Sequence, residues 1–324
     1  MRTTSQQPTT GSIAGRTTGD RPWPVYPEIP LPTLRIALNR DNTHTEPPAD
    51  SRNRVSLMSS WANFNSRWRI PPHPSTMVNV VIIGGHGKVA LHLARLAVSA
   101  GHSVTSVIRD PSQNDDISAT GAKPRVLSLE DSPVSDFTNL FTETKAEVVY
   151  FTAGAGGKGG EERTKAVDYQ GALKTFDAID GVSGKKPRLV LVSGVDVGNE
   201  DRFPEHYTEE DKQIALRVRK AIAVWYKWKY EAEKVLVKRT SFEWIILRPG
   251  GLSDNPGTGK ADIGRTHITS TISREDVAAA LLHLATVPSK ASGLGIDMVG
   301  GDKPIEPALD AFIEKGVTDW LGQA

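Results

Sequence analysis

From residue 78 onwards, short runs of aliphatic and β-branched residues alternate with segments in which apolar residues recur every three or four positions. The runs have the length and composition of buried strands, and they cover 78–83, 103–108, 122–127, 147–152, 188–193, 242–247 and 295–299. Helices are expected between them, including 91–100, 274–286 and one long helix or two abutting helices over 209–238. Strands separated by helices predict an α/β fold with a Rossmann-like, doubly wound, mostly parallel sheet.

The first 76 residues lack this alternation. They contain 11 of the 21 prolines, and nine arginines, no lysine and five acidic residues give them a net charge of +4. Proline removes backbone hydrogen bonds, and little apolar surface offsets the ordering entropy, so we expect a disordered extension over 1–76. A single compact domain is then expected over 77–324.

Residues 54–69 of this extension have a basic amphipathic pattern, with large apolar residues at three- or four-residue spacing between arginines. Arginine and serine without lysine are also typical of organellar transit peptides, but the prolines within 22–32 would interrupt a presequence helix. A cytoplasmic location is therefore expected, and a mitochondrial location is the alternative if 1–76 act as a transit peptide.

Composition excludes several classes of function. The 39 basic and 38 acidic residues nearly balance, which argues against a nucleic-acid partner. Without cysteine the chain has no disulfides, cysteine-ligated metal or thiol catalysis, and the eight histidines show no ligand spacing, so no metal is expected. No apolar run approaches the ~20 residues of a membrane span.

The first predicted strand runs directly into the segment GGHGKVA (84–90), and a helical pattern follows. A glycine turn in this position lets backbone N–H groups and the positive end of the helix bind a pyrophosphate. Gly84 permits the tight turn, Gly87 the close approach of phosphates, and Ala90 the packing of helix on strand. The alternating strands and helices around the turn favour a dinucleotide site over an ordinary turn.

The second predicted strand ends at Arg109. An acidic residue there usually binds the ribose 2′-hydroxyl of NAD, whereas arginine pairs with the 2′-phosphate of NADP. Asp110 follows at once and could cap the next turn or reach the ribose. We therefore expect NADP, with NAD as the alternative. The segment NPGTGK (255–260) imitates a phosphate loop, but Asp254 and Ala261 stand where that motif requires glycine and serine or threonine.

From Met77 to about Gly316 the chain resembles the atypical short-chain dehydrogenases/reductases, the group that includes biliverdin-reductase- and flavin-reductase-related proteins and NmrA-like proteins. The resemblance rests on eight motifs in the family's order: GGHGKVA (84–90), YFTAGAGGK (150–158), VDYQGALK (167–174), LVSGVD (191–196), KYEAEKVL (229–236), LRPGGLSDNPGTGK (247–260), ISREDV (272–277) and VGGDKP (299–304).

This resemblance implies a set of cofactor-binding positions at the carboxyl ends of strands. The glycine loop would hold the pyrophosphate, 128–129 would lie against the adenine, 153–155 would approach the ribose and nicotinamide, and 249–251 would meet the nicotinamide amide. Relatives often have aspartate at position 128. The implied residues are Gly84, Gly85, Gly87, Lys88, Val89, Arg109, Ser128, Leu129, Ala153, Gly154, Ala155, Lys229, Pro249, Gly250 and Gly251.

The catalytic pattern of the family is incomplete. Its active members use a Tyr-x-x-x-Lys pair on a helix and a serine after the fifth strand, so that tyrosine can pass a proton. Ser193 and Lys229 fit two of these positions, but Trp225 stands at the tyrosine position and Tyr226 is displaced by one residue. Ser193, Lys229 and Tyr226 are the catalytic candidates, and the alternative is that Ser193 and Lys229 bind ribose or pack.

Two functions remain. The first is an NADP-dependent oxidoreductase that passes hydride to a small-molecule acceptor, such as a flavin or quinone, without a tyrosine acid. The second is a non-catalytic NADP(H)-sensing regulatory protein of NmrA-like type, which would act through a protein partner. The sequence leaves the substrate and the oligomeric state open.

Overall fold

The computed structural model describes residues 77–156 and 159–320. The predicted extension over 1–76, with its amphipathic segment at 54–69, lies outside the described residues. Within the part that is described, the predicted α/β architecture is confirmed. No helix in that part combines the length and apolar character needed to cross a membrane.

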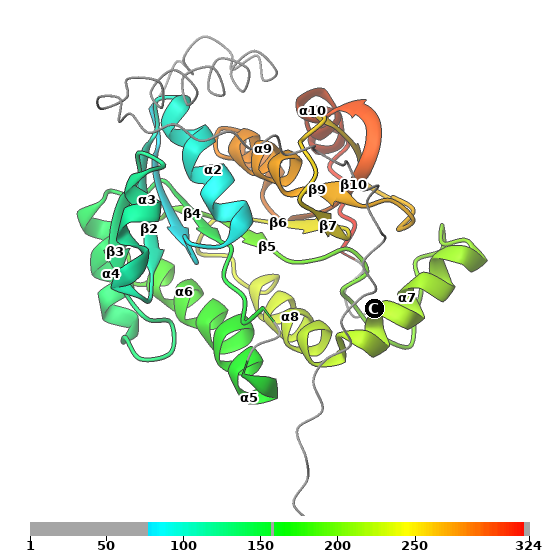
Figure 1. Cartoon of the computed structure of the whole chain (residues 1–324), viewed down its shortest axis with the longest axis horizontal. Coiled ribbons are helices and arrows are strands. Elements are labelled where there is room, and N and C mark those ends of the chain that lie inside the picture. Colours follow the sequence, from blue (N-terminus) through cyan, green and yellow to red (C-terminus); the bar gives the residue numbers. More distant parts are fainter. Residues whose placement is uncertain (1–76, 157–158, 321–324) are drawn as a thin grey trace, which may run out of the picture. The chain divides into compact units, whose positions relative to one another are not determined.

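The centre of the described chain is an eight-stranded sheet in the order β3-β2-β1-β4-β5-β6-β10-β8 (Figure 1). All neighbouring strands are parallel except β10 and β8. The strands are β1 (Asn79–Ile83), β2 (Ser103–Ile108), β3 (Lys123–Val126), β4 (Val148–Phe151), β5 (Arg188–Val192), β6 (Trp244–Pro249), β8 (Lys260–Ile263) and β10 (Leu294–Pro304). A separate pair consists of β7 (Leu252–Ser253) and β9 (Ile272–Ser273).

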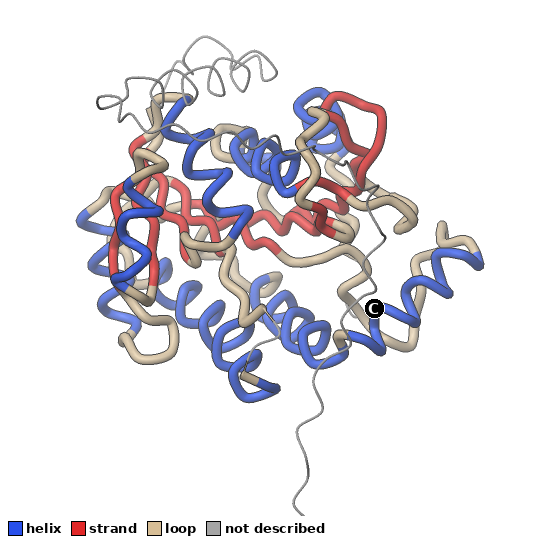
Figure 2. Tube along the Cα trace, in the orientation of Figure 1, coloured by secondary structure: helices blue, strands red, loops and turns tan. Residues whose placement is uncertain are grey.

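Helices lie on both sides of the sheet (Figure 2). One core joins the sheet to α2 (Lys88–Ser99), α9 (Arg274–Leu284) and α10 (Ile305–Lys315). The other core joins it to α4 (Val134–Glu143), α6 (Gly171–Asp180) and α8 (Ala223–Leu236). The remaining elements are η1 (Pro111–Gln113), α3 (Asn114–Ser118), α5 (Gly160–Thr164), the π-helical turn η2 (Lys165–Gln170), α7 (Glu209–Ala221) and η3 (Ser289–Ala291).

The continuous apolar runs form strands because they are covered on both faces. In β1, Val81 and Ile83 face the α4/α6/α8 core, whereas Val80 and Ile82 face the α2/α9 core. The strand order reverses between β1 and β4, and in open α/β sheets ligands bind at the carboxyl ends of strands beside such a reversal.

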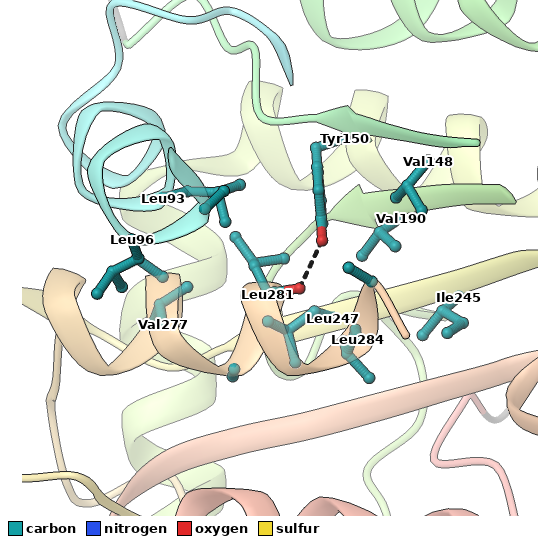
Figure 3. Close-up of a cluster of buried hydrophobic side chains, with 14 of the residues drawn as sticks. Leu93, Leu96, Val148, Tyr150, Val190, Ile245, Leu247, Val277, Leu281 and Leu284 are labelled. Atoms are coloured by element: carbon teal, nitrogen blue, oxygen red, sulfur yellow. Dashed lines mark hydrogen bonds between the residues drawn. The ribbon is translucent and has the colours of Figure 1, made fainter. Parts of the chain in front are cut away.

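Figure 3 shows the core under α2 and α9, where Leu93 and Leu281 lie close to Tyr150 of β4. The Tyr150 hydroxyl donates a hydrogen bond of 2.7 Å to the carbonyl of Leu281, and burial raises the pKa of this phenol. Its polar atom is therefore satisfied within the core, and Tyr150 has a structural role.

The long helical pattern over 209–238 forms two abutting helices, α7 and α8, as one of the two alternatives expected. They meet at Ile222, whose φ of −124° breaks the helical backbone and whose side chain is exposed. α7 begins with a capping box in which Thr208 and Asp211 each bond the other's backbone N–H. The shorter strands β7, β8 and β9 were not expected from the apolar pattern, because each has only two to four residues.

Candidate functional site

A cavity of about 260 Å³ lies at the carboxyl ends of β1, β2 and β4, beside the reversal in strand order. The sequence-predicted residues that line it come from four separate segments of the chain. They are Gly84, Gly85, Gly87, Arg109, Leu129, Ala153, Gly154 and Ala155. The structure therefore brings most of the expected cofactor-binding positions together.

The glycine loop fits closely between β2 and the loop after β4. Gly84 has a φ of +84°, and a Cβ atom there would lie 2.6 Å from the Cα atom of Ala153. A Cβ atom on Gly85 would lie 2.7 Å from the Cβ atom of Ser106. Both positions require glycine, because backbone or buried neighbours occupy the space of any side chain.

The amino end of α2 opens toward this loop. Gly87 is its N-cap residue, and in the described structure no side chain caps the helix and no acidic residue lies in its first turn. The first-turn N–H groups, including those of Lys88 and Val89, have no partner within the helix and carry the positive end of its dipole. This arrangement suits a phosphate group.

Lys88 does not extend its side chain into the cavity. Its Nζ atom lies 2.6 Å from Asp254, which also binds Arg274 at 2.7 Å, and the hydrogen bond from Lys88 lowers the pKa of the Asp254 carboxyl. Any contact of Lys88 with a pyrophosphate in this geometry is made by its backbone N–H. The same ion pairs tie the loop after β7 to the start of α2.

At the end of β2, Arg109 lies 3.4 Å from Glu130, and Arg163 of α5 lies 3.6 Å from the other oxygen of the same carboxylate. All three residues line the cavity. Asp110 is occupied elsewhere, since it accepts a hydrogen bond of 2.9 Å from the Ser112 backbone, which lowers its pKa and caps η1. Of the two roles considered for Asp110, the structure shows the cap.

The two residues expected against the adenine, Ser128 and Leu129, have different roles. Leu129 lines the cavity. The Ser128 hydroxyl instead donates a hydrogen bond of 2.7 Å to Asp131 and accepts bonds from the backbone N–H groups of Glu130 and Asp131. The Ser128 side chain therefore builds the turn that holds Leu129 and Glu130 in place.

A buried ion pair supports the loop after β4. Asp168, in the π-helical turn η2, accepts a hydrogen bond of 2.9 Å from the Ala155 backbone N–H, and a Cβ atom on Gly154 would lie 3.1 Å from its carboxylate. The Lys229 Nζ atom lies 3.2 Å from Asp168 and donates to the Ala153 carbonyl at 3.4 Å. Lys229 therefore contacts the underside of the cavity wall, and it is absent from the residues that line the cavity.

The other catalytic candidates do not reach this cavity. Tyr226 is 2% exposed and donates its hydroxyl to the Asp196 carbonyl, and burial raises the pKa of this phenol. Ser193 is buried, and its Oγ atom has no hydrogen-bond partner among the described residues. The Trp225 indole covers Gly194 so closely that a Cβ atom there would lie 2.7 Å from the ring.

Pro249 is the last residue of β6, and Gly250 and Gly251 follow it; none of the three lines this cavity or the larger one described below. Gly250 donates a backbone hydrogen bond of 2.8 Å to the Met298 carbonyl, and a Cβ atom there would lie 2.9 Å from Val299. The packing of β6 against β10 therefore explains this glycine without a ligand.

The segment that imitates a phosphate loop binds carboxylates of its own chain. The backbone N–H groups of Thr258 and Gly259 donate to Asp276 at 3.0 and 2.8 Å, and that of Gly257 donates to Glu275 at 2.7 Å. Because these donors are used at the amino end of α9, the rejection of this segment as a phosphate site agrees with the structure.

Sequence reasoning missed Glu130, Arg163 and Asp168. Asp168 lies in the motif VDYQGALK, but only the π-helical turn directs its carboxylate to Ala155 and Lys229. Arg163 stands in a run of charged residues that resembles an ordinary solvated helix face. No spacing in the sequence places it beside Arg109.

Several known proteins are similar to this chain in sequence and in architecture. Residues 84–288 match the family model described as NAD(P)H-binding. The chain is 40% identical over 248 residues to UPF0659 protein C216.03 of Schizosaccharomyces pombe, covering 75% of this chain and 98% of that relative. It is 30% identical over 235 residues to the uncharacterized sugar epimerase YhfK of Bacillus subtilis, covering 72% and 99%.

Two solved structures are also similar. A candidate NAD-dependent epimerase/dehydratase from Bacillus halodurans aligns with a TM-score of 0.59 at 27% identity, over 72% of this chain and 98% of that one. ChuY, an anaerobillin reductase from Escherichia coli O157:H7, aligns with a TM-score of 0.54 at 23% identity, over 69% and 97%. The second likeness supports the fold alone.

Proposed function

Because the chain belongs to the NAD(P)H-binding family of atypical short-chain dehydrogenases/reductases, we propose that it is an NADP-dependent oxidoreductase that passes hydride to a small acceptor. The observation that carries the proposal is the cavity lined by the glycine loop, at the uncapped amino end of α2, and by two arginines, Arg109 and Arg163. A pyrophosphate fits the backbone donors, and the arginines supply charge at the adenosine end.

The choice of NADP rests on Arg109 and Arg163. Both guanidinium groups contact Glu130, and a ribose 2′-phosphate would offer them a stronger, doubly charged partner. Glu130 would then turn toward solvent, because its carboxylate would repel the phosphate. Asp110 does not compete, since it caps η1.

The route of the proton separates this proposal from the usual family mechanism. A bound nicotinamide would supply a hydride. With Trp225 at the tyrosine position and the Tyr226 hydroxyl buried, neither of these two positions offers a phenol to protonate a carbonyl product. Flavin-like and quinone acceptors suit such a site, because their reduced forms take a proton from water. Lys229 and Asp168 would act as positioning residues that hold Ala153 and Ala155 against the cofactor.

A second candidate is a protein that binds NADP(H) and signals to a partner without turnover. The observation that favours it is the packing of Trp225 on Gly194, which fills the space beside Ser193. The names of two similar proteins, an uncharacterized sugar epimerase and a candidate epimerase/dehydratase, support an enzyme.

Calorimetric titration with NADPH and NADH tests the cofactor assignment. We expect Arg109→Ala and Arg163→Ala each to weaken NADPH binding roughly tenfold or more, since each removes a charge-assisted hydrogen bond, and to change NADH binding by less than about threefold. Glu130→Gln should strengthen NADPH binding. Arg125→Ala is the matched control, because Arg125 is an exposed arginine of β3 outside the cavity. Equal losses for the two cofactors would contradict the assignment of NADP.

Consumption of NADPH with a panel of flavins and quinones tests the reaction. Turnover that survives Tyr226→Phe and collapses in Lys229→Ala would support a reductase without a tyrosine acid. Tight binding of NADPH without turnover on any acceptor would support the sensor instead. A folded protein that binds neither nicotinamide cofactor would refute both functions.

A further inference from the structure

A second cavity, of about 340 Å³, lies beside β6 and β10. Its walls come from the loop after β5, from α7, from the loop after β8 and from Asp319 and Trp320, which follow α10. It shares no lining residue with the cavity of the glycine loop. Its volume falls at the small end of the range of about 300–1,000 Å³ for small-molecule sites. A ligand here would thus be additional to the dinucleotide.

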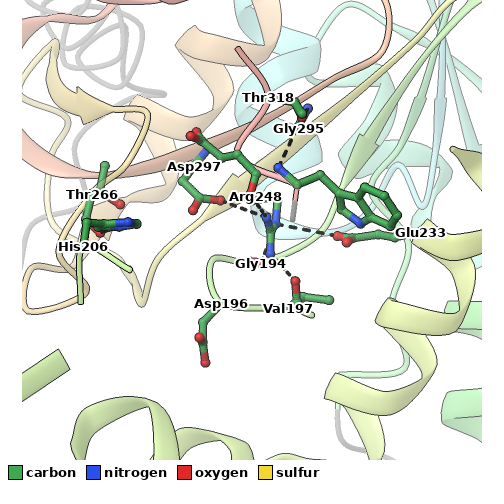
Figure 4. Close-up of polar contacts among 12 residues, drawn as sticks. Gly194, Asp196, Val197, His206, Glu233, Arg248, Thr266, Gly295, Asp297 and Thr318 are labelled. Carbon is green, nitrogen blue, oxygen red and sulfur yellow. Dashed lines mark hydrogen bonds and ion pairs between the residues drawn. The ribbon is translucent and has the colours of Figure 1, made fainter. Parts of the chain in front are cut away.

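Buried charge forms the floor of this cavity. Arg248 and Asp297 are cross-strand partners in β6 and β10, and each is 4% exposed. Figure 4 shows Arg248 between Asp297, at 3.4 Å, and Glu233, at 3.8 Å. Arg248 also donates to the carbonyls of Gly194, at 3.3 Å, and Val197. The guanidinium group is therefore fully engaged with the protein and fixes the geometry of the floor.

The carboxyl group of Asp297 is less well satisfied. Its Oδ1 atom has no hydrogen-bond partner among the described residues, although the side chain lines the cavity. The nearest acidic side chain, Asp319, accepts a bond of 3.0 Å from the Asp297 backbone N–H. Burial raises the pKa of Asp297 to about 7. Arg248 is the ion-pair partner of this carboxyl, at 3.4 Å, and a ligand hydroxyl would add the hydrogen bond that its Oδ1 atom lacks among the described residues.

Of the arginines that line the cavity, Arg202 and Arg265 have no ion-pair partner among the described residues, whereas Arg219 has one. Arg219 is held by Asp196 through two hydrogen bonds of 2.8 Å, so its charge is neutralised. Arg202 and Arg265 also line the cavity, are exposed, and form no ion pair with a described residue. Guanidinium groups of this kind bind carboxylate and phosphate oxygens. The exposed residues of the lining thus include two arginines and one carboxylate, Glu205, and the excess of positive charge favours an anion.

Aromatic side chains complete the lining. Phe203 and Trp320 both face the cavity, and the guanidinium carbon of Arg219 lies 4.7 Å from the centre of the Phe203 ring. Apolar ring faces next to hydrogen-bonding groups suit a ligand that has both C–H and O–H surfaces.

We propose that this cavity binds a small polyhydroxylated anion, with its carboxylate or phosphate on Arg202 and Arg265 and a hydroxyl group on Asp297. The anion stays at the opening, where water reduces the cost of its desolvation, and the hydroxyl group enters the buried end. This site is independent of which nicotinamide cofactor occupies the first cavity.

Calorimetric titration of the full chain tests the proposal with four probes. Gluconate and glucose 6-phosphate carry both an anion and hydroxyl groups, inorganic phosphate carries the anion alone, and glucose carries hydroxyl groups alone. We expect gluconate or glucose 6-phosphate to bind at least tenfold more tightly than phosphate or glucose. Preference between these two distinguishes a carboxylate from a phosphate ligand.

Two variants locate the site. Arg265→Gln should weaken the better probe roughly tenfold, since it removes a charged donor at the opening. Arg217→Gln is the matched control, because Arg217 is an exposed arginine of α7 outside the cavity lining, and it should leave binding unchanged. Asp297→Asn should also weaken the probe, and NADPH binding reports whether this buried variant is folded.

The outcomes separate this proposal from the dinucleotide site. Absence of binding by gluconate and glucose 6-phosphate to a chain that binds NADPH overturns the cavity proposal alone. Equal losses in Arg265→Gln and Arg217→Gln also overturn it, and so does binding of both gluconate and glucose 6-phosphate that is no tighter than the binding of inorganic phosphate. Binding of gluconate that is lost in Arg265→Gln supports the cavity even if neither nicotinamide cofactor binds.

Discussion

Two glycines decide what can lie at the carboxyl ends of β1 and β5. Gly84 brings the backbone of the glycine loop against Ala153, because nothing larger fits between them. Gly194 makes room for the indole of Trp225, so the missing side chain at 194 and the tryptophan at the tyrosine position are sterically linked. At this scale a single methyl group determines whether the cofactor cavity and the region around Ser193 keep their shape.

Replacement of Gly84 by alanine should destabilise the protein and abolish NADPH binding. We expect a cost of about 1 kcal/mol from the positive φ and about 1–3 kcal/mol more from contact with the Ala153 backbone. Gly184→Ala is the matched control, since Gly184 has a φ of +77° with nothing within 4 Å of a Cβ atom. Urea unfolding measures the stability of both variants and calorimetry measures their NADPH binding. Equal losses of stability in the two variants would contradict the steric argument.

Two motifs of the family act on each other at the scale of elements. The turn PGTGK directs its backbone N–H groups at the acidic residues that begin α9, within ISREDV. Asp276 additionally bonds the side chain of Ser273, which caps the helix. The two segments therefore hold the amino end of α9 against the loop before β8, and their acidic and glycine residues have a structural explanation.

Asp276→Ala should lower the free energy of unfolding by at least about 2 kcal/mol. The substitution removes the charged acceptor of the part-buried backbone N–H groups of Thr258 and Gly259, and a hydrogen bond to a charged group contributes about 1.5–3 kcal/mol. Asp310→Ala serves as the control, because this exposed residue of α10 pairs with the side chain of His283 and with no other described residue; there we expect less than about 1 kcal/mol. A similar loss in both variants would show that the turn does not depend on Asp276.

Charge is distributed unevenly over the described molecule. The cavity of the glycine loop is lined by the partly exposed ion pair of Arg109 and Glu130, whereas acidic and basic side chains beneath β6 and β10 are almost wholly buried. Asp297 is surrounded there by Arg248, Asp319, Glu233 and Asp196. Because burial and these acidic neighbours favour its protonated form, this group links the stability of the whole protein to pH.

The protein should become less stable as the pH rises from about 4 to about 7, because Asp297 holds a proton in the folded state that it loses in the unfolded state. Burial raises its folded-state pKa to about 7 from the ordinary 3.8, so the folded chain holds a proton that the unfolded chain has lost. The slope from one proton is at most about 1.4 kcal/mol per pH unit. Urea unfolding from about pH 5 to about pH 8 should show this slope in the wild type and a flatter one in Asp297→Asn. An unchanged slope in the variant would assign the linkage to another group.

The assignment of one domain to residues 77–324 can be tested by removing residues 1–76. A protein that starts at Met77 should bind NADPH with the affinity of the full chain, because the residues that line the cofactor cavity all lie between 83 and 167. Calorimetry compares the two proteins, and a loss of affinity greater than about tenfold would place part of the site in residues 1–76.

Local pattern was sufficient for the sheet and for the glycine loop. Continuous β-branched runs form strands wherever helices cover both faces, and a glycine turn between a strand and a helix brings backbone donors together within a few residues. The fold, the strands β1 to β6 and the position of the loop therefore follow from residues that are neighbours in the chain.

The surroundings of the charged side chains required the tertiary structure. Arg163 meets Arg109 at Glu130, and Lys229 meets Asp168 beneath Ala155, through contacts between residues that are far apart in the chain. Spacing cannot reveal such contacts, because the turns and helix packing between the two segments determine them. The order of motifs indicated a dinucleotide site. Only the packed structure, however, placed Lys229 and Tyr226 outside the lining of the cavity at the glycine loop, because that placement depends on long-range contacts.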